Sequence, residues 1–277
     1  MKSEVFRCQG LVTLSFDDCY KETIENVKPI LSKYDIKATF NLPTKFIGKK
    51  LEGRQVASTD DIKKLVKNGH EIASHSHSHI PLSVEWKDNI SRFIRSFLGS
   101  SNKLNFLRRV RKFIITTSAQ GSKRKLIGIE EFIEEQRKSK KIIEDTFGVN
   151  CSSFVFPGGL YNKEAIKILS KSGYTSARTS DIGYNVIGKL NPYALKVQTW
   201  DRFTTAKDAE KWVNKAHKRG LWLIECFHLV GKENNNDYEY FTSVEEFRKH
   251  IEFISKISAE GLWIAPQKEV IEWLLKK

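Results

Sequence analysis

The sequence predicts an α/β protein built on a mostly parallel sheet or barrel. The chain has 277 residues, which suffices for one large domain. Its residues are 40% hydrophobic and 29% charged, a composition that permits a full core and excludes a disordered or collagenous protein. Short apolar segments alternate with amphipathic ones, as in proteins made of strand and helix pairs. We therefore expect residues 1–277 to form a single domain.

The predicted elements follow one another in a regular order. Strands are expected at residues 12–16, 38–42, 71–74, 153–156, 221–227 and 262–265. Helices are expected at residues 21–34, 59–68, 130–147, from 163, 207–218, 244–258 and at the end of the chain. Ser58 or Thr59 can cap the second helix, and Asn162 the helix from Lys163. Function is expected at the carboxyl ends of the strands.

The positive charge of the chain is concentrated in one segment. The formal net charge is +14, and residues 86–126 contain eleven Lys or Arg but only one acidic residue. Apolar residues recur there at helical spacing, which predicts an inserted pair of basic amphipathic helices. The insertion could pack on the barrel or contact an anionic membrane peripherally. Nucleic-acid binding is not expected, because the rest of the chain is nearly balanced in charge.

Several features indicate a cytoplasmic protein. The first ten residues contain no apolar targeting segment, and no apolar run reaches the length of a membrane span. The four cysteines have neither zinc-finger nor disulfide-framework spacing. We expect the protein in the cytoplasm, with a peripheral position at the inner membrane face as the alternative.

Two polar clusters lie at the ends of predicted strands. Asp17-Asp18 follows the first strand, and His75-Ser76-His77-Ser78-His79 follows a later one. Alone, the carboxylates could cap a helix, and the histidines could belong to a surface loop. Together, two histidines and one carboxylate can bind a metal ion with positions left open, and a second aspartate can take a proton from water. The pair of clusters therefore predicts a catalytic metal site.

The same segments resemble the polysaccharide deacetylase family (carbohydrate esterase family four). Residues 15–20 resemble its TFDDG motif, residues 69–79 are similar to GHEIxxHSxxH, and residues 37–40 match the KATFF strand between them. Residues 154–159 stand where the family has its RxPYG-type loop, and His228 ends a strand as in the last motif. The resemblance runs from about Leu11 to Trp273, interrupted by the basic segment.

The resemblance implies a distorted (β/α) barrel of about seven strands with a metal ion in its mouth. It implies the following roles: Asp18, His75 and His79 as metal ligands, Asp17 as general base, His228 as general acid, Ser76 as a support of the histidine loop, and Pro157, Gly158 and Trp200 around the oxyanion and acetyl group. Zinc is the expected divalent ion, and cobalt, manganese and nickel are alternatives. His77 has no implied role.

The implied reaction is removal of the acetyl group from an N-acetylated carbohydrate, lipid-linked substrates included. An O-acetyl esterase or an amidase could use the same site. A non-catalytic glycan-binding relative is the third reading, which the joint presence of all five principal site residues disfavours.

Two positions depart from the family pattern. Val155 replaces the arginine that orients the base in many members, and Gly158 replaces a tyrosine. A further strand is expected after the Pro157 loop, with Arg178 of residues 174–179 at its end, and neighbouring strand ends converge on one mouth. We therefore predict that the Arg178 guanidinium lies within salt-bridge distance of Asp17 and acts in catalysis by orienting it.

Overall fold

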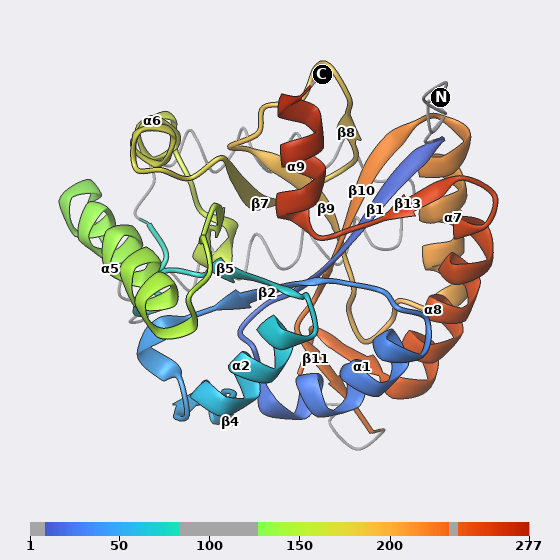
Figure 1. Ribbon diagram of the computed structural model, residues 1–277, viewed down its shortest axis with the longest axis horizontal. Helices are drawn as coiled ribbons and strands as arrows, with labels where there is room; N and C mark the ends of the chain where they lie inside the picture. Colours follow the sequence, from blue (N-terminus) through green and yellow to red (C-terminus); the bar gives the residue numbers. More distant parts are fainter. Residues whose placement is uncertain (1–8, 83–126, 233–237, 277) are drawn as a thin grey trace.

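The computed structural model describes residues 9–82, 127–232 and 238–276 (Figure 1). The basic segment at 86–126, predicted to be a helical insertion, lies outside the described residues. Among the helices of the described residues, none is long and apolar enough to cross a membrane.

Seven parallel strands close into a barrel. They are β1 (Gly10–Phe16), β2 (Thr39–Leu42), β5 (Glu71–Ser74), β6 (Ser153–Val155), β7 (Ser176–Ile182), β9 (Leu195–Thr199) and β10 (Leu221–Phe227). Each strand pairs with the next, and β10 pairs with β1 to close the ring. The expected seven-stranded barrel is thereby confirmed.

The barrel is distorted around β1. This strand pairs with β10 over most of its length, with β13 (Leu262–Ile264) at its start and with β2 only at its end. The remaining strands form short accessory pairs: β8 (Asn185–Val186) with β10, β3 (Lys50–Leu51) with β4 (Arg54–Gln55), and β11 (Leu229–Gly231) with β12 (Phe241–Ser243).

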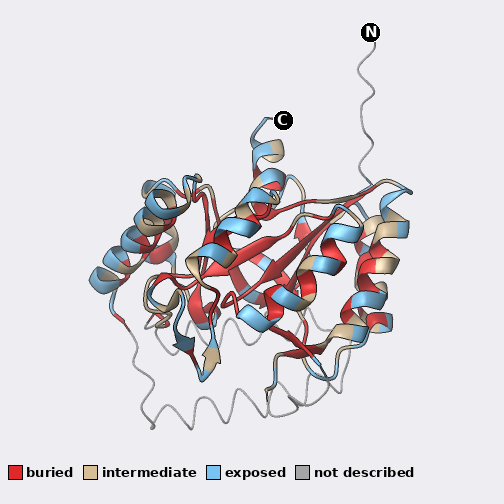
Figure 2. Ribbon diagram, turned by 60° about the horizontal axis from the view of Figure 1, so that its bottom comes forward, coloured by how far each residue is buried: buried red, intermediate tan, exposed pale blue. Residues whose placement is uncertain are grey.

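Helices surround the strands, as Figure 1 shows. They are α1 (Lys21–Lys33), α2 (Thr59–Lys67), α5 (Ile129–Phe147), α6 (Lys163–Lys171), α7 (Ala206–Lys218), α8 (Val244–Ser258) and α9 (Gln267–Leu275), with two 3₁₀ turns, η1 (Thr44–Phe46) and η3 (Pro157–Gly159). Figure 2 shows buried residues along the strands and on the helix faces turned toward them. This is the pattern expected when amphipathic helices cover a sheet.

The start of α9 closes the end of the barrel at which the strands begin. The Gln267 main-chain N–H donates to Thr39, its side-chain amide donates to Ser176, and the Lys268 N–H donates to Glu71. Thr39, Glu71 and Ser176 are the first residues of their strands. The opposite end, where the strands finish, is therefore the mouth of the barrel.

Candidate active site

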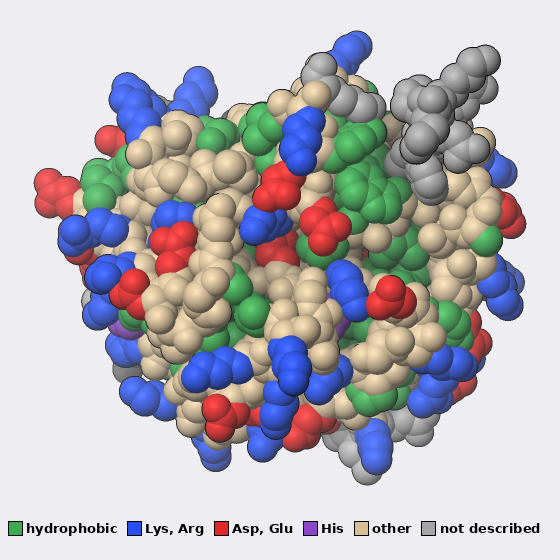
Figure 3. Space-filling view, in the orientation of Figure 1, with side chains coloured by type: hydrophobic (Ala, Val, Ile, Leu, Met, Phe, Trp, Pro, Cys, Tyr) green, Lys and Arg blue, Asp and Glu red, His purple; other side chains and the backbone are tan. Residues whose placement is uncertain are grey.

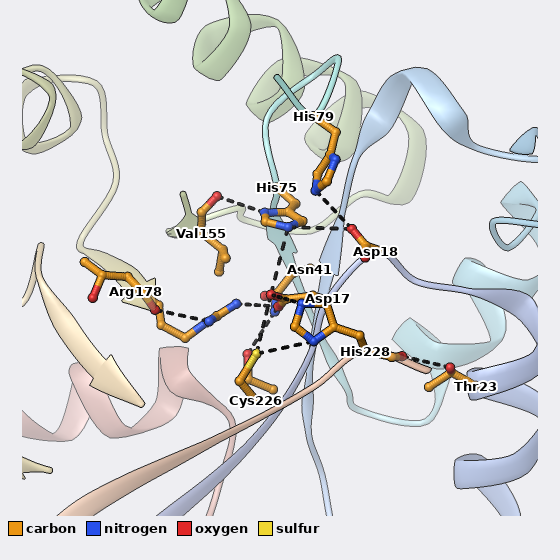
Figure 4. A network of polar contacts seen from close by, with 12 residues as sticks. Asp17, Asp18, Thr23, Asn41, His75, His79, Val155, Arg178, Cys226 and His228 are labelled. Carbon is orange, nitrogen blue, oxygen red and sulfur yellow. Dashed lines mark hydrogen bonds and ion pairs between the residues drawn. The ribbon is translucent and has the colours of Figure 1, made fainter. Parts of the chain in front are cut away.

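Alternation along the strands turns polar side chains into the barrel at its mouth. Phe16, Phe40 and Phe227 form a stack, and Phe247 of α8 packs edge-on against Phe16 and Phe227. These rings therefore point outward, toward the helices. Because side chains alternate along a strand, their neighbours point inward. The inward set comprises Asp17, Asn41, Cys226 and His228 (Figure 4).

Asp18, His75 and His79 come together as the two motifs predict. One ligand atom from each lies within 4.8 Å of the others. Asp18 Oδ1 is 3.1 Å from His79 Nε2 and 3.7 Å from His75 Nε2. This oxygen is buried and accepts no hydrogen bond of good geometry. A buried, unsatisfied carboxylate oxygen beside two imidazole nitrogens suits a divalent cation.

Hydrogen bonds fix the orientation of the histidine loop. His75 Nδ1 lies 3.0 Å from the Val155 carbonyl oxygen, so this nitrogen donates and Nε2 keeps its lone pair for the cluster. The His79 main-chain N–H donates to Ser76 Oγ over 3.0 Å. Ser76 thus lies where a support of the loop was expected.

Both site loops contain strained backbone. Asp18 and Cys19 in the first loop, and Ser76 and His79 in the second, have φ between 49° and 67°. Residues with a side chain rarely adopt this left-handed region. Such strain is common where a site over-determines the conformation, and here it turns the Asp18 and His79 side chains toward each other.

The electrostatic environment leaves His75 neutral. Burial lowers its pKa to about 4, against the opposing influence of Asp17. For His79, burial also disfavours the charged form, but contact with Asp18 outweighs it and raises the pKa. A neutral imidazole such as His75 is the form that binds a metal ion.

The two carboxylate oxygens of Asp17 have different neighbours. Oδ1 accepts a hydrogen bond from Asn41 Nδ2 over 2.7 Å and another from Arg178 Nη2. Oδ2 faces Cys226 Sγ at 3.5 Å and His228 Nε2 at 3.6 Å. Burial would raise the pKa of Asp17, but Arg178 and the two nearby histidines lower it overall. Asp17 is therefore ionised, with one oxygen fixed and the other turned to the mouth.

The predicted contact between Arg178 and Asp17 is present. Val155 and Arg178 are register partners on the adjacent parallel strands β6 and β7, so their side chains point to the same side. Arg178 is fully buried, and its Nη1 donates to the Thr179 carbonyl oxygen. The guanidinium thus reaches Asp17 from the strand beside the position where the family pattern has its arginine.

His228 is held on both sides. Its main-chain oxygen accepts a hydrogen bond from Thr23 Oγ1 over 2.9 Å. Its ring stacks on Tyr240 with centroids 4.6 Å apart, and its side chain is 17% exposed. His228 is therefore oriented toward Asp17 and still open to solvent.

The Pro157–Gly158 turn follows β6 at the mouth. Gly158 is exposed, with φ 59°, and belongs to η3. The next residue must be glycine, since a Cβ on Gly159 would lie 1.8 Å from Ser180 Oγ. The turn lies at the mouth, and its role as a donor to substrate stays a prediction.

The expectation for Trp200 is wrong. Its side chain is 0% exposed and packs against Phe227, Trp212 and His250 on the outside of the barrel. Its indole nitrogen donates to Glu225 over 3.3 Å. Trp200 follows a short strand whose inward and outward positions the sequence does not reveal, and it belongs to the core.

Two side chains of the site were not predicted from the sequence. Asn41 interrupts an apolar strand at an inward position, which is a usable signal for a buried polar contact. Cys226 reads as an ordinary small apolar residue of β10, so nothing in the sequence distinguishes it. Both contact Asp17.

Comparison with known proteins identifies related chains. A sequence model of the polysaccharide deacetylase family matches residues 7–177. The chain is 24% identical over 164 residues to the poly-beta-1,6-N-acetyl-D-glucosamine N-deacetylase of Staphylococcus aureus (strain MRSA252). The aligned region covers 58% of this chain and 45% of that protein. The chain thus spans less than half the length of the curated relatives it matches.

Solved structures show the same fold. The Xyl-CE4 domain of a multidomain xylanase from the hindgut metagenome of Trinervitermes trinervoides has a TM-score of 0.53 and 18% identity, covering 95% of this chain and 90% of that chain. BA3943 of Bacillus anthracis, a CE4 family pseudoenzyme, has a TM-score of 0.53 and 15% identity, covering 95% and 65%. With the family model covering more than half of its residues, the chain belongs to the polysaccharide deacetylase family.

Proposed function

We propose that this protein is a metal-dependent hydrolase that removes the acetyl group from an N-acetylated carbohydrate. The observation that carries the proposal is the convergence, at one barrel mouth, of a buried Asp18–His75–His79 cluster with Asp17 and His228. The known activity of the staphylococcal relative on a poly-N-acetylglucosamine supports the substrate class. A lipid-linked carbohydrate falls within the same class.

The three clustered side chains fit a divalent ion, with zinc proposed and cobalt, manganese or nickel as alternatives. Asp18 supplies a buried carboxylate oxygen 3.1 Å from His79 Nε2, and His75 supplies a neutral imidazole held by Val155. When bound, such an ion supplies Lewis acidity to the acetyl carbonyl and to water.

The remaining proposed roles belong to two side chains and one main-chain group at the mouth. Asp17 takes the proton of the attacking water on Oδ2, because Oδ1 is already engaged by Asn41 and Arg178. His228, open to solvent beside Oδ2, gives a proton to the departing nitrogen. The Gly158 main-chain N–H is the proposed oxyanion donor.

The proposed setting is the cytoplasm, with peripheral contact at the inner membrane face through residues 86–126. The described cysteines Cys19, Cys151 and Cys226 are buried free thiols, which supports a reducing compartment.

Acetate release provides the test. We expect purified protein to release acetate from N-acetylglucosamine oligomers, to lose this activity with a chelator and to regain it with one equivalent of zinc or cobalt. Asp17→Asn should bind metal without turnover, and His79→Ala should lose both. His77→Ala is the matched control, since this histidine of the same loop bonds to Thr44 outside the cluster and should keep both.

The alternatives give different results in the same assay. Faster acetate release from O-acetylated xylan than from any N-acetylated oligomer would identify an esterase instead. Metal binding with no acetate from either substrate would contradict hydrolysis and favour a non-catalytic relative.

A further inference from the structure

A second group of metal-binding side chains lies beside the first. Asp17, Cys226 and His228 each offer one ligand atom, and these atoms lie within 4.8 Å of one another (Figure 4). Cys226 Sγ is 3.5 Å from Asp17 Oδ2 and 3.9 Å from His228 Nδ1. The group thus combines a thiol, a carboxylate and an imidazole, which are the three ligand types that zinc prefers.

The separations suit one tetrahedral ion. Zinc bonds of about 2.0 Å to oxygen or nitrogen and about 2.3 Å to sulfur place neighbouring ligand atoms roughly 3.3–3.6 Å apart. The observed 3.5 and 3.9 Å are as close to this as the 3.1 and 3.7 Å within the Asp18–His75–His79 cluster. In the second group His228 turns Nδ1 toward the sulfur and Nε2 toward Asp17 Oδ2, which is 3.6 Å away, so its ring must turn for one nitrogen to face an ion held by both partners.

The second group is also held in place before any ion arrives. Arg178 and Asn41 fix Asp17 through Oδ1, which leaves Oδ2 facing the sulfur. Stacking on Tyr240 fixes the ring of His228, whose partial exposure leaves a path from solvent. For an ion entering from the mouth, Asp17 and Cys226 are already side by side, and the His228 ring is the part of the group that would have to turn.

We propose that Asp17, Cys226 and His228 form a second site for a divalent, thiolate-preferring ion such as zinc. As the metal–sulfur bond forms, the thiol S–H bond breaks and the proton passes to solvent. The positive Arg178 side chain beside Asp17 opposes the ion, so this site binds more weakly than the first. An ion here would engage Asp17 and His228, the proposed base and acid, so excess zinc should inhibit acetate release. This inhibition rests on the proposed function, whereas binding of the second ion does not.

Cobalt titration without substrate tests the binding. The first equivalent should give the spectrum of a nitrogen and oxygen site. Further cobalt should add the near-ultraviolet sulfur-to-cobalt charge-transfer band that reports a thiolate ligand. Cys226→Ser should abolish this band and keep the first equivalent, which also shows that the variant folds. Cys151→Ser and Cys19→Ser are matched controls at buried thiols outside the group and should keep the band.

A band that survives in Cys226→Ser, or that vanishes only in Cys19→Ser, would overturn the proposal. In the acetate-release assay, Cys226→Ser should raise the zinc concentration that gives half inhibition by roughly tenfold or more. Removing a hydrogen-bond partner of a metal ligand lowers metal affinity by about tenfold or more, and removing the ligand itself should cost at least as much. Unchanged zinc inhibition in this variant would also count against the site. If no variant has activity, the proposed function fails while the spectroscopic result still stands.

Discussion

At the scale of single residues, Asp17 is contacted by an arginine on β7 rather than by one at position 155. Val155 cannot hydrogen-bond through its side chain, and its register partner Arg178 contacts Asp17 instead. The prediction rested on adjacent parallel strand ends sharing one mouth, and the contact is present although Arg178 lies near the start of β7 rather than at its end. The second donor to the same oxygen, Asn41, needed knowledge of which side of β2 faces inward.

Replacing Arg178 by lysine tests the role of the planar guanidinium. We expect kcat to fall by up to roughly a hundredfold, because an ammonium group cannot hold the carboxylate in the same orientation. Metal content at the Asp18–His75–His79 cluster should stay at the wild-type level, since Arg178 contacts none of these three side chains. Acetate release and metal analysis measure both quantities. Arg137→Lys, at an exposed arginine of α5, is the control and should change neither; loss of metal in Arg178→Lys would contradict the assigned role.

Asn41→Leu tests the second donor. It removes the hydrogen bonds to Asp17 Oδ1 and Ser15 Oγ, so we expect kcat to fall about tenfold while KM and metal content are kept. Combined with Arg178→Lys, the loss should be less than additive, since both groups act on one oxygen. Asn185→Leu removes a buried asparagine outside the site and should lower thermal stability without this kinetic change. Strictly additive losses would mean that Asn41 acts independently of Arg178.

At the scale of secondary structure, the amphipathic helices and apolar strands such as β6 and β13 could be predicted, whereas other short strands could not. The expected cap of α2 is Ser58, which forms a reciprocal capping box with Asp61, and Asn162 caps α6. By contrast, β9 and the accessory strands have two to five residues, and tertiary pairing rather than local pattern determines them. The unrecognised β9 explains why Trp200 was misplaced.

A buried Glu–His hydrogen bond joins a strand to a helix. Glu225 of β10 and His250 of α8 are both fully buried, and their Oε2 and Nε2 atoms are 2.7 Å apart. His250→Ala would leave a buried carboxylate with only the indole of Trp200 as a partner, so we expect the free energy of unfolding to fall by about 3–5 kcal/mol. Urea denaturation measures the change.

Glu225→Gln is the companion variant for this pair. The amide keeps a polar group against His250 and removes the buried charge, so its stability loss should be smaller. Equal losses in the two variants would show that the charge of Glu225 is unimportant.

At the scale of the whole molecule, closure of the barrel assembles the site. Pairing of β10 with β1 brings Cys226 and His228 beside Asp17, although more than two hundred residues separate them in the chain. The motifs predicted that Asp17, Asp18, His75, His79 and His228 gather at one mouth. They could not predict Cys226, because its contact exists only once the barrel closes.

Global stability should depend on pH through His70. Burial, followed by the charges of Lys37 and Lys28, lowers its pKa to about 4, and its Nδ1 accepts a hydrogen bond from the Ala38 N–H. The unfolded chain takes up this proton near pH 6.5. The stabilising contribution is therefore complete above pH 6.5 and is lost as the pH falls toward 4.

The variant His70→Asn keeps an acceptor for Ala38 and does not titrate. We expect its unfolding free energy, from urea denaturation, to fall less between pH 6.5 and pH 4, with a difference of up to about 3 kcal/mol from the wild type. If the unfolding free energies of the two proteins fell equally between pH 6.5 and pH 4, His70 would not contribute to the loss of stability in acid.

The distribution of charge makes a prediction for the complete chain. Figure 3 shows lysine and arginine interspersed with aspartate and glutamate over the visible face. Residues 86–126, outside the described part, contain eleven Lys or Arg and one acid, with apolar residues at helical spacing. Packing on the barrel does not require so many positive charges, whereas an anionic lipid surface attracts them.

We therefore expect the full chain to sediment with phosphatidylserine-containing vesicles at low salt and to be released at high salt, since screening weakens such attraction. Neutral phosphatidylcholine vesicles should bind much less. Replacing the eleven basic residues by glutamine, which keeps the apolar pattern, should abolish the salt-sensitive fraction. Equal sedimentation of wild type and variant would exclude electrostatic attraction through this segment and leave packing within the protein as its role.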